Sequence, residues 1–377
     1  MAEIVATDAG VDAQQVETAL RDLWRREAAS SGVAVTRLRT LNLVIAAGES
    51  AADDDVQQTL HWIATRHPSR VVVLATTREE QPDGIQTSVQ IRSALGEAAD
   101  RQVCSEEVTL TAGPSTASLL PGATLPLLVQ DLPTYLWWWE PGDPMASPLF
   151  EALSHPCDRT IVDSGAVPAP GLAFLRRLAQ RTAERREHAF ADLNWNRLYP
   201  WRELTAQLFD SSDTRDSLDQ ITSVEVAYHG SDKSAGGPTQ ALLYIAWLAG
   251  RLDWRPTAAR SRGNEREIWF DRAQGDVSAR ILAGESTPGQ GNGLAGVQLI
   301  GGTEDQSTHL VLELAEDGSF IASTSDLPLS IERRRITRYT RPSTADVLLD
   351  ELDSRHRDDV LVEALAVIAA MPDRIER

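Results

Sequence analysis

The side chains best suited to catalysis or metal binding are scattered along this chain of 377 residues. No two histidines stand at the i, i+4 spacing that places two metal ligands on one face of a helix. The two cysteines, Cys104 and Cys157, lack the spacing of a zinc site. The sequence also contains no G-x-G-x-x-G, P-loop, G-x-S-x-G, H-E-x-x-H or C-x-x-C motif. We therefore expect no catalytic centre, no metal and no cofactor.

Glu106 is one of two carboxylates that remain candidates for a general acid or base. It lies in a strand expected over residues 103–111, on the face that carries the apolar side chains. A buried carboxylate needs a partner, so we expect a structural ion pair with an arginine such as Arg70 or Arg159. This interpretation outweighs a catalytic role.

Asp163 is the second carboxylate, and it stands at the end of an expected strand. If the first half of the chain is doubly wound, the loops at the carboxyl ends of its strands converge, namely residues 76–77, 142–143 and 163–165. A small polar ligand fits such a crevice. The alternative function is therefore a sugar-phosphate-binding enzyme with Asp163 and Glu106 as candidate acid or base.

Three consecutive tryptophans, Trp137, Trp138 and Trp139, form the most conspicuous local pattern. In a strand, Trp137 and Trp139 share one face and Trp138 takes the other. The simpler interpretation is a core on both sides of the sheet, because indole rings bury so much area. The alternative places one ring at a protein interface, where aromatic anchors are common.

Arginine is concentrated in two places against the acidic background. One group lies on an expected helix and the other near the C-terminal end: Arg176, Arg177, Arg181, Arg185 and Arg186, and Arg333, Arg334, Arg335, Arg338 and Arg341. Solvated faces are the commoner explanation. The alternative is docking of an acidic partner surface.

The N-terminal half contains the elements that must position these residues. Asp12 starts an amphipathic helix that runs to about residue 26. Apolar runs at residues 41–46 and 71–74 flank a helix that begins at residues 53–55 and ends at Pro68, which makes a strand–helix–strand unit typical of a parallel sheet. Further strands are expected over residues 85–92, 103–111, 134–140 and 159–163, with a helix over residues 172–190.

The C-terminal half has a different pattern, which follows a polar stretch at residues 211–219. Short strands separated by glycine-rich turns are expected at residues 224–228, 268–270, 297–300, 310–314 and 320–323. A buried helix is expected from Pro238 to Leu252, and a last helix over residues 345–371.

These elements predict an α/β chain of two domains. Residues 1–210 form an N-terminal domain with a mixed or parallel sheet and helices on both faces. Residues 220–377 form a mostly antiparallel α+β domain with a closing helix.

The charge of the chain limits its partners. Its formal net charge of −19 repels phosphate backbones and anionic lipids, so we expect neither nucleic acid nor a membrane as a partner. The N-terminus carries Glu3, Asp8 and Asp12 where a secretory signal needs positive charge. We expect a cytoplasmic protein in a reducing compartment, consistent with two cysteines.

A string of motifs resembles the OpcA family, the glucose-6-phosphate dehydrogenase assembly proteins. The motifs are HPSRV at 67–71, QVCSEEV at 102–108, LPLL at 125–128, DLPTYLWW at 131–138, DRTIVDS at 158–164 and DLNWNRLYPWREL at 192–204. Their order and spacing also match, and the last motif is the most specific.

This resemblance implies a non-catalytic allosteric effector that binds glucose-6-phosphate dehydrogenase and promotes its active oligomeric form in the oxidative pentose phosphate pathway. It also implies a source among cyanobacteria or actinobacteria. Cyanobacterial relatives are linked to redox control through cysteines. This chain has none after Cys157, which leaves Cys104 and Cys157 as the candidates for such control.

For contact with the dehydrogenase we expect Trp195, Arg197, Trp201 and Arg202 from the last motif, because aromatic and arginine side chains dominate interface energetics. The group Arg333, Arg334 and Arg335 is the second choice. The alternative is that Trp195 and Trp201 pin their helix to the sheet.

Overall fold

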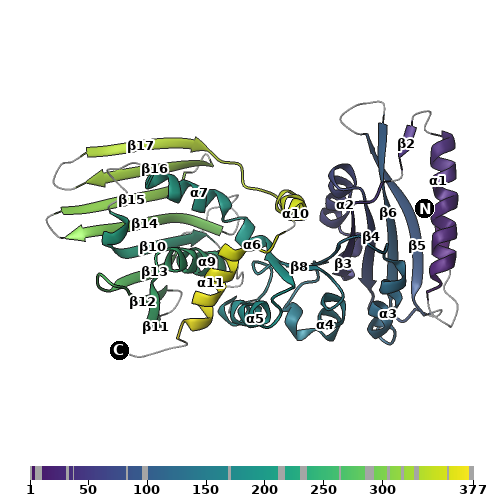
Figure 1. The fold of residues 1–377 in the computed structure, drawn as a ribbon, viewed down its shortest axis with the longest axis horizontal. Helices are drawn as coiled ribbons and strands as arrows, with labels where there is room; N and C mark the ends of the chain where they lie inside the picture. Colours follow the sequence, from purple (N-terminus) through teal and green to yellow (C-terminus); the bar gives the residue numbers. More distant parts are fainter. Residues whose placement is uncertain are drawn as a thin grey trace. The chain divides into compact units, whose positions relative to one another are not determined.

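A computed structural model provides the fold (Figure 1). It describes residues 2–4, 11–30, 34–36, 38–81, 84–95, 101–168, 171–210, 217–229, 236–262, 265–284, 293–303, 306–315, 318–326, 331–354 and 356–372.

Contacts between residues group the chain into two compact units. Unit 1 contains residues 1–162, 187–191 and 343–357, and unit 2 contains residues 163–186, 192–342 and 358–377. This grouping does not follow the linear boundary between residues 210 and 220, because the chain passes from one unit to the other several times. The division into a domain of residues 1–210 and a domain of residues 220–377 stays a prediction.

Unit 1 is a mixed sheet with helices on both faces. Its elements are β1 (Ala2–Ile4), α1 (Ala13–Ser30), β2 (Ala34–Thr36), β3 (Leu41–Gly48), α2 (Asp54–Arg66), β4 (Ser69–Thr76), β5 (Gln86–Leu95), β6 (Arg101–Ala112), α3 (Leu120–Thr124), β7 (Thr134–Trp138), α4 (Pro148–Ser154), β8 (Arg159–Val162), β9 (Ala189–Asp192, whose last residue belongs to unit 2) and α10 (Thr344–Asp353). The strand order is β1-β5-β6-β4-β3-β7-β8-β9, and β2 pairs with β6.

The central strands β6, β4, β3, β7 and β8 are parallel, while β5 is antiparallel to β6. All eight residues of β3 are buried, which explains its continuous apolar sequence. Helix α1 covers one face of the sheet, where Trp24 reaches Glu106, and α2 covers the other, where Gln57 reaches Arg92 (Figure 1). The predicted mixed sheet covered by helices is confirmed.

Unit 2 is a mostly antiparallel sheet packed against helices. Its elements are α5 (Gly171–Glu184), α6 (Leu193–Asn196), α7 (Tyr199–Leu208), β10 (Ile221–His229), α9 (Gly236–Arg251), β11 (Arg255–Arg262), β12 (Glu265–Asp271), β13 (Val277–Ala283), β14 (Gly293–Thr303), β15 (Gln306–Leu314), β16 (Ser319–Asp326), β17 (Ile331–Arg338) and α11 (Asp359–Ala370). The strand order is β11-β12-β13-β10-β14-β15-β16-β17.

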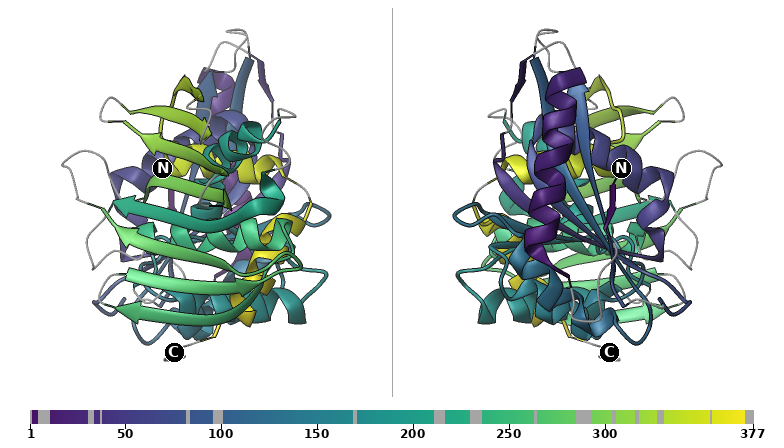
Figure 2. Two further views of the ribbon diagram at one scale, coloured as in Figure 1. Left: turned by 90° about the vertical axis from the view of Figure 1, so that its left-hand side faces the viewer. Right: turned by 90° about the vertical axis from the view of Figure 1, so that its right-hand side faces the viewer.

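Among the described strands of this sheet, only β10 and β13 pair in parallel. Helix α9 is buried nearly all round, as its apolar sequence predicts, and Tyr244 on it shares a hydrogen bond of 2.6 Å with Thr205 on α7. Both helices lie on the same face of the sheet. Figure 2 (left) shows the strands from the opposite face, which no described helix covers.

Two helix predictions are wrong in their extent. The helix expected over residues 172–190 ends at Glu184, because residues 189–192 extend as β9 and bury Phe190 and Ala191 at the sheet of unit 1. The closing helix expected over residues 345–371 is two helices, α10 and α11. Each has its own N-cap, Ser343 and Asp358, and the break between them is a helix start that the apolar pattern alone does not show.

None of the described helices is both long and apolar enough to cross a lipid bilayer.

Candidate functional site

Asp192 is the centre of a buried polar cluster at the end of β9. Its carboxylate is fully buried and accepts hydrogen bonds from the backbone N–H of Ser164 at 2.9 Å, the hydroxyl of Ser164 at 2.6 Å and the N–H of Asn194 at 3.0 Å. Burial and the nearby charge of Asp163 raise the pKa of Asp192 to about 6, although these hydrogen bonds oppose the shift. The cluster thus joins two loops of unit 2 through one carboxyl group.

Asn194 and Gln240 extend the cluster into α9 and β14. The amide of Asn194 donates to the carbonyl of Gly236 at 3.4 Å and to the Ser164 hydroxyl at 3.2 Å. Gln240 donates to Asn194 Oδ1 at 2.8 Å and accepts from the N–H of Leu294 at 3.1 Å. Because both amides are used on their donor and acceptor sides, the cluster is a rigid connector of four chain segments.

Asp163, a predicted acid or base, lies beside this cluster in a fork-shaped ion pair. Arg197 donates to both of its carboxylate oxygens at 2.8 Å, and both side chains are 17% exposed. Burial alone would lower the pKa of Arg197, but Asp163 and Asp192 outweigh it and raise that pKa. Arg197 therefore holds the loop after β8, and Asp163 is an ion-pair partner.

Glu106, the other candidate acid or base, lies in unit 1 and is also held by arginine side chains. Arg70 donates to it at 2.8 Å, Arg39 at 2.7 Å and the indole N–H of Trp24 at 2.6 Å. Burial would raise the pKa of Glu106, but the hydrogen bond from Arg39 and the charge of Arg70 lower it to about 2. The predicted ion pair with Arg70 is confirmed, while Arg159 pairs with Glu351 instead.

The turns expected to form one strand-end crevice are divided between the units. Residues 76–77 and 142–143 belong to unit 1, and residues 163–165 belong to unit 2. Among the described residues there is no group of three or more histidine, cysteine, aspartate or glutamate side chains placed to hold a metal ion.

The tryptophans proposed as contact residues are buried. Trp195 is 0% and Trp201 is 3% exposed, with Trp195 Nε1 donating to Asp358 at 2.7 Å and Trp201 packed on Phe320 with ring centroids 4.7 Å apart. Their burial agrees with the alternative, in which they pin their helices to the sheet. The same motif leaves Tyr199 62% exposed.

Arg202 links the buried and exposed parts of this motif. Its guanidinium lies 3.7 Å from the centroid of the Trp195 ring, a cation–π contact. Burial lowers the pKa of Arg202 to about 10. Its role in partner contact stays a prediction, and so does that of Arg197.

The second predicted contact group lies on β17. Arg334 is exposed, and Arg335 donates to Gln207 on α7 at 3.1 Å. The side chain of Arg333 lies outside the described part of the structure. Successive residues of a strand point to opposite faces, so Arg334 lies on the uncovered face together with Ile336.

The three consecutive tryptophans are mainly core residues. Trp137 and Trp138 are buried, and Trp138 packs on Phe150 with centroids 5.3 Å apart. Trp139 is half-buried, and its ring meets Trp137 at 5.1 Å in an edge arrangement.

Both cysteines are buried thiols. Burial and the charge of Glu27 raise the pKa of Cys104 to about 11, so its thiol is protonated at neutral pH and is a poor nucleophile. The Cys157 thiol donates to the Leu153 carbonyl at 3.1 Å. A redox role for either residue stays a prediction.

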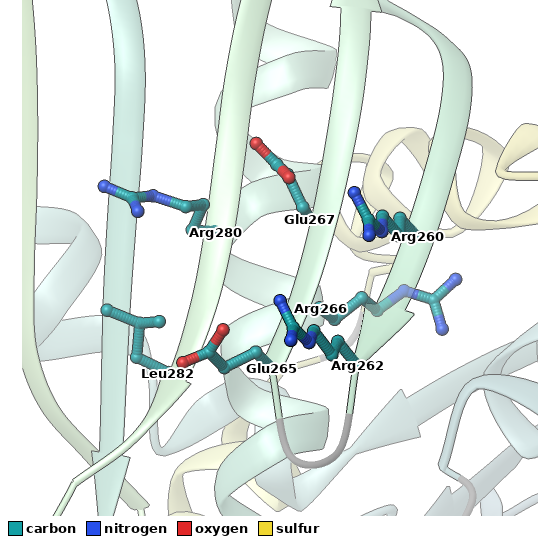
Figure 3. A pocket seen from close by; sticks show the side chains of 7 residues that line it. All are labelled: Arg260, Arg262, Glu265, Arg266, Glu267, Arg280 and Leu282. Atoms are coloured by element: carbon teal, nitrogen blue, oxygen red, sulfur yellow. The ribbon is translucent and has the colours of Figure 1, made fainter. Parts of the chain in front are cut away.

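A shallow hollow of about 170 Å³ lies on the uncovered face of unit 2 (Figure 3). It is lined by Arg260, Arg262, Glu265, Arg266, Glu267, Arg280 and Leu282. Strand register places Glu267 between Arg260 and Arg280, and Figure 3 shows Arg266 turned away from the others. Alternating charges across neighbouring strands form a cross-strand ladder rather than a phosphate site.

Known proteins resemble the chain along most of its length. Residues 61–180 match the family model described as glucose-6-phosphate dehydrogenase subunit N-terminal domain, and residues 188–365 match that of its C-terminal domain. An OxPP cycle protein OpcA from Synechococcus elongatus is 31% identical over 81% of this chain and 68% of its own length. The chain belongs to the OpcA family. A second OpcA protein, from Nostoc punctiforme, is 32% identical over 55% of this chain, and the match covers 42% of that longer protein.

Among solved structures, glucose-6-phosphate 1-dehydrogenase from Mycobacterium avium has a similar fold, with a TM-score of 0.52 over 88% of this chain and 90% of that one. Its sequence identity of 12% limits the likeness to the fold.

The OpcA-family motif at 192–204 is understood from this chain's own contacts, in which it supplies Asp192, Asn194, Trp195 and Arg197 to a buried centre. The sequence gives no periodic signal for Gln240 and Asp358, which complete that centre from distant helices.

Proposed function

We propose that this OpcA-family protein binds glucose-6-phosphate dehydrogenase as a non-catalytic partner and promotes its active oligomeric form in the oxidative pentose phosphate pathway. One observation carries the proposal: both halves of the chain match models described as domains of a subunit of that enzyme. Glu106 and Asp163, the candidate acid or base of the alternative enzyme function, are both held in ion pairs with arginines.

The mechanism needs only a difference in affinity. A partner that binds the active assembly more tightly than the inactive one shifts their equilibrium about tenfold for each ~1.4 kcal/mol of that difference. No side chain of this protein has to reach the substrate. The effect on the enzyme is therefore expected in its oligomer size and its apparent KM together.

We place the main contact at the exposed end of the motif at 192–204. Tyr199 is 62% exposed, and the neighbouring Arg202 is held on the buried Trp195 ring. Tyrosine and arginine are the residue types that most often anchor protein interfaces, and a supported side chain loses little entropy on binding. Arg334 and Ile336 on β17, the latter 64% exposed, are the second choice.

The test mixes the purified protein with the dehydrogenase of the same organism. We expect a larger dehydrogenase assembly in analytical ultracentrifugation and a lower apparent KM for glucose 6-phosphate. Unchanged KM and unchanged assembly size would contradict the proposal, and turnover of a sugar phosphate by this chain alone would favour the enzyme alternative.

Tyr199→Ser tests the contact surface more cleanly than Arg202→Glu, because Arg202 is largely buried against Trp195. We expect the serine variant to weaken the complex at least about tenfold, the usual size of a hot-spot effect. Leu119→Ser is the matched control, since Leu119 is similarly exposed, at 58%, but lies in unit 1. Equal effects of both substitutions would rule out this surface.

A further inference from the structure

A cavity of about 370 Å³ lies within unit 1, apart from the Glu106 and Asp192 centres. It is lined by Asp55, Gln58, Thr59, Trp62, Trp139, Ser343, Thr344 and Ala345. Its size is within the range of small-molecule sites, roughly 300–1,000 Å³. It combines two indole rings with several polar groups, which is the usual composition of such sites.

Three elements form its walls. Asp55, Gln58, Thr59 and Trp62 follow the i, i+3, i+4, i+7 spacing and therefore share one face of α2. Trp139 follows β7 directly, and residues 343–345 form the start of α10. Helices α2 and α10 lie side by side (Figure 1), joined by Arg66, which pairs with Asp350 at 3.3 Å and with Asp353.

The two indoles supply apolar faces for a ligand. Trp62 is 48% exposed although it lines a cavity, so much of its ring is available to another molecule. Trp139 is fixed by its edge contact with Trp137. The face of an aromatic ring is electronegative, so it attracts the weakly positive C–H groups on the flat side of a sugar ring.

The polar groups supply both donors and acceptors. Within the described part of the chain, the side chains of Asp55 and Gln58 have no hydrogen-bond partner of their own. A carboxylate only accepts hydrogen bonds, whereas an amide both donates and accepts. Adjacent hydroxyl groups of a polyol, which need both kinds of partner, fit this pair.

The charge of the cavity argues against a phosphorylated ligand. None of the eight described lining residues is cationic, and Asp55 is a carboxylate. The start of α10 is occupied by its own capping box, in which Ser343 and Asp346 exchange hydrogen bonds, so the Asp346 carboxylate offsets the positive end of that helix.

We propose that this cavity binds a neutral, polyhydroxylated ring, a monosaccharide or a comparable cyclic polyol. The ring stacks on Trp62 and its hydroxyl groups bond to Asp55 and Gln58. This site does not depend on the proposed partnership with the dehydrogenase.

Saturation-transfer NMR with D-glucose as the probe tests the site on the full chain. We expect transfer to the ring C–H protons in the wild type and its loss in Trp62→Ala, with most of it retained in Trp62→Phe. Tyr199→Ala, which removes an exposed aromatic side chain from unit 2, is the control and leaves the signal unchanged. Because Trp62 is half exposed, thermal unfolding of Trp62→Ala checks that the fold is intact.

Glucose 6-phosphate distinguishes neutral from charged ligands. We expect glucose 6-phosphate to bind at least about fivefold more weakly than D-glucose. Asp55→Asn should lower the affinity for D-glucose and reduce the difference in affinity between the two ligands. Asp54→Asn, at a neighbouring position that does not line the cavity, changes neither. Absence of any transfer from D-glucose, or tighter binding of glucose 6-phosphate, would overturn the proposal.

Discussion

Glu106 in unit 1 and Asp192 in unit 2 are equally buried, at 1% and 0% exposure, yet their surroundings move their pKa values in opposite directions. Glu106 has two arginines beside it and a pKa of about 2. Within the described part of the chain, Asp192 receives hydrogen bonds only from Ser164 and Asn194, and it has a pKa of about 6.

The difference shows that burial does not determine the protonation state of a carboxyl group by itself. Desolvation disfavours the charged form at both positions, and only cations close enough to compensate reverse it. Neutral donors at Asp192 reduce the shift without reversing it. Unit 1 therefore contains a charged centre, and unit 2 a centre that gains a proton in mildly acidic conditions.

The largest expected effect comes from removing the compensating cation. Arg70→Met removes one of the two arginines that donate to the buried Glu106, so we expect the free energy of unfolding to fall by about 3–5 kcal/mol. Urea denaturation at neutral pH measures this loss. The double variant Arg70→Met, Glu106→Met should recover most of it, and a double variant no more stable than the single one would contradict the charge argument.

The pH dependence of stability separates the two centres. The folded pKa of Asp192, about 6, lies above its ordinary value of 3.8, so the folded state holds a proton that the unfolded state releases. Stability from this group is full below pH 3.8 and falls by about 3 kcal/mol as the pH rises to about 6, at roughly 1.4 kcal/mol per unit.

Glu106 behaves in the opposite way. Its stabilising contribution is full above pH 4.5 and is lost as the pH falls through about 2. Urea denaturation at several pH values measures how the free energy of unfolding depends on pH. Asp192→Asn should remove the dependence between about pH 3.8 and 6, and Glu106→Gln should remove the dependence between about pH 2 and 4.5. If Asp192→Asn leaves the slope between pH 4 and 6 unchanged, Asp192 is not the group that titrates there.

A smaller loss is expected from the neutral part of the unit 2 centre. Gln240→Leu removes the partners of Asn194 Oδ1 and of the Leu294 N–H, and unpaired buried polar groups cost about 1–3 kcal/mol. Thermal unfolding measures this change. Gln180→Leu on the exposed side of α5 is the matched control, with an expected change under about 0.5 kcal/mol. Similar losses in both variants would show that the hydrogen bonds of Gln240 add no stability beyond that of an exposed side chain.

The smallest effect on stability is expected at the exposed end of the same motif. Tyr199→Ser should change the free energy of unfolding by less than about 0.5 kcal/mol, because Tyr199 is 62% exposed. A loss above about 1 kcal/mol in urea denaturation would mean that this side chain supports the fold, and it would no longer separate binding from stability.

Sequence patterns predicted the Glu106 centre but not the Asp192 centre, for a physical reason. Strand alternation placed Glu106 among apolar neighbours, and the need for a cation pointed to an arginine such as Arg70 or Arg159. Asp192 is the last residue of a strand of only four residues, which is too short to show an alternation of apolar and polar side chains. Its partners come from loops and from Gln240, which only the folded chain brings together.

The same limit applies to tryptophan. The size of the indole predicts either a core or an interface position, and the burial of Trp195 and Trp62 differs widely, at 0% and 48% exposure. Local sequence does not distinguish them, because burial depends on which distant segment covers the ring. For Trp195 that segment begins at Asp358.

The repeated passage of the chain between its two units has a consequence for dissection by truncation. A fragment that ends at residue 210 contains Arg159 but lacks α10, so the buried guanidinium has neither the carboxylate of Glu351 nor the carbonyl of His356. The complementary fragment lacks the strand-end loops that surround Gln240. We therefore expect neither piece to be self-sufficient, so that two co-expressed fragments would have to reassociate before either acquires its native interior.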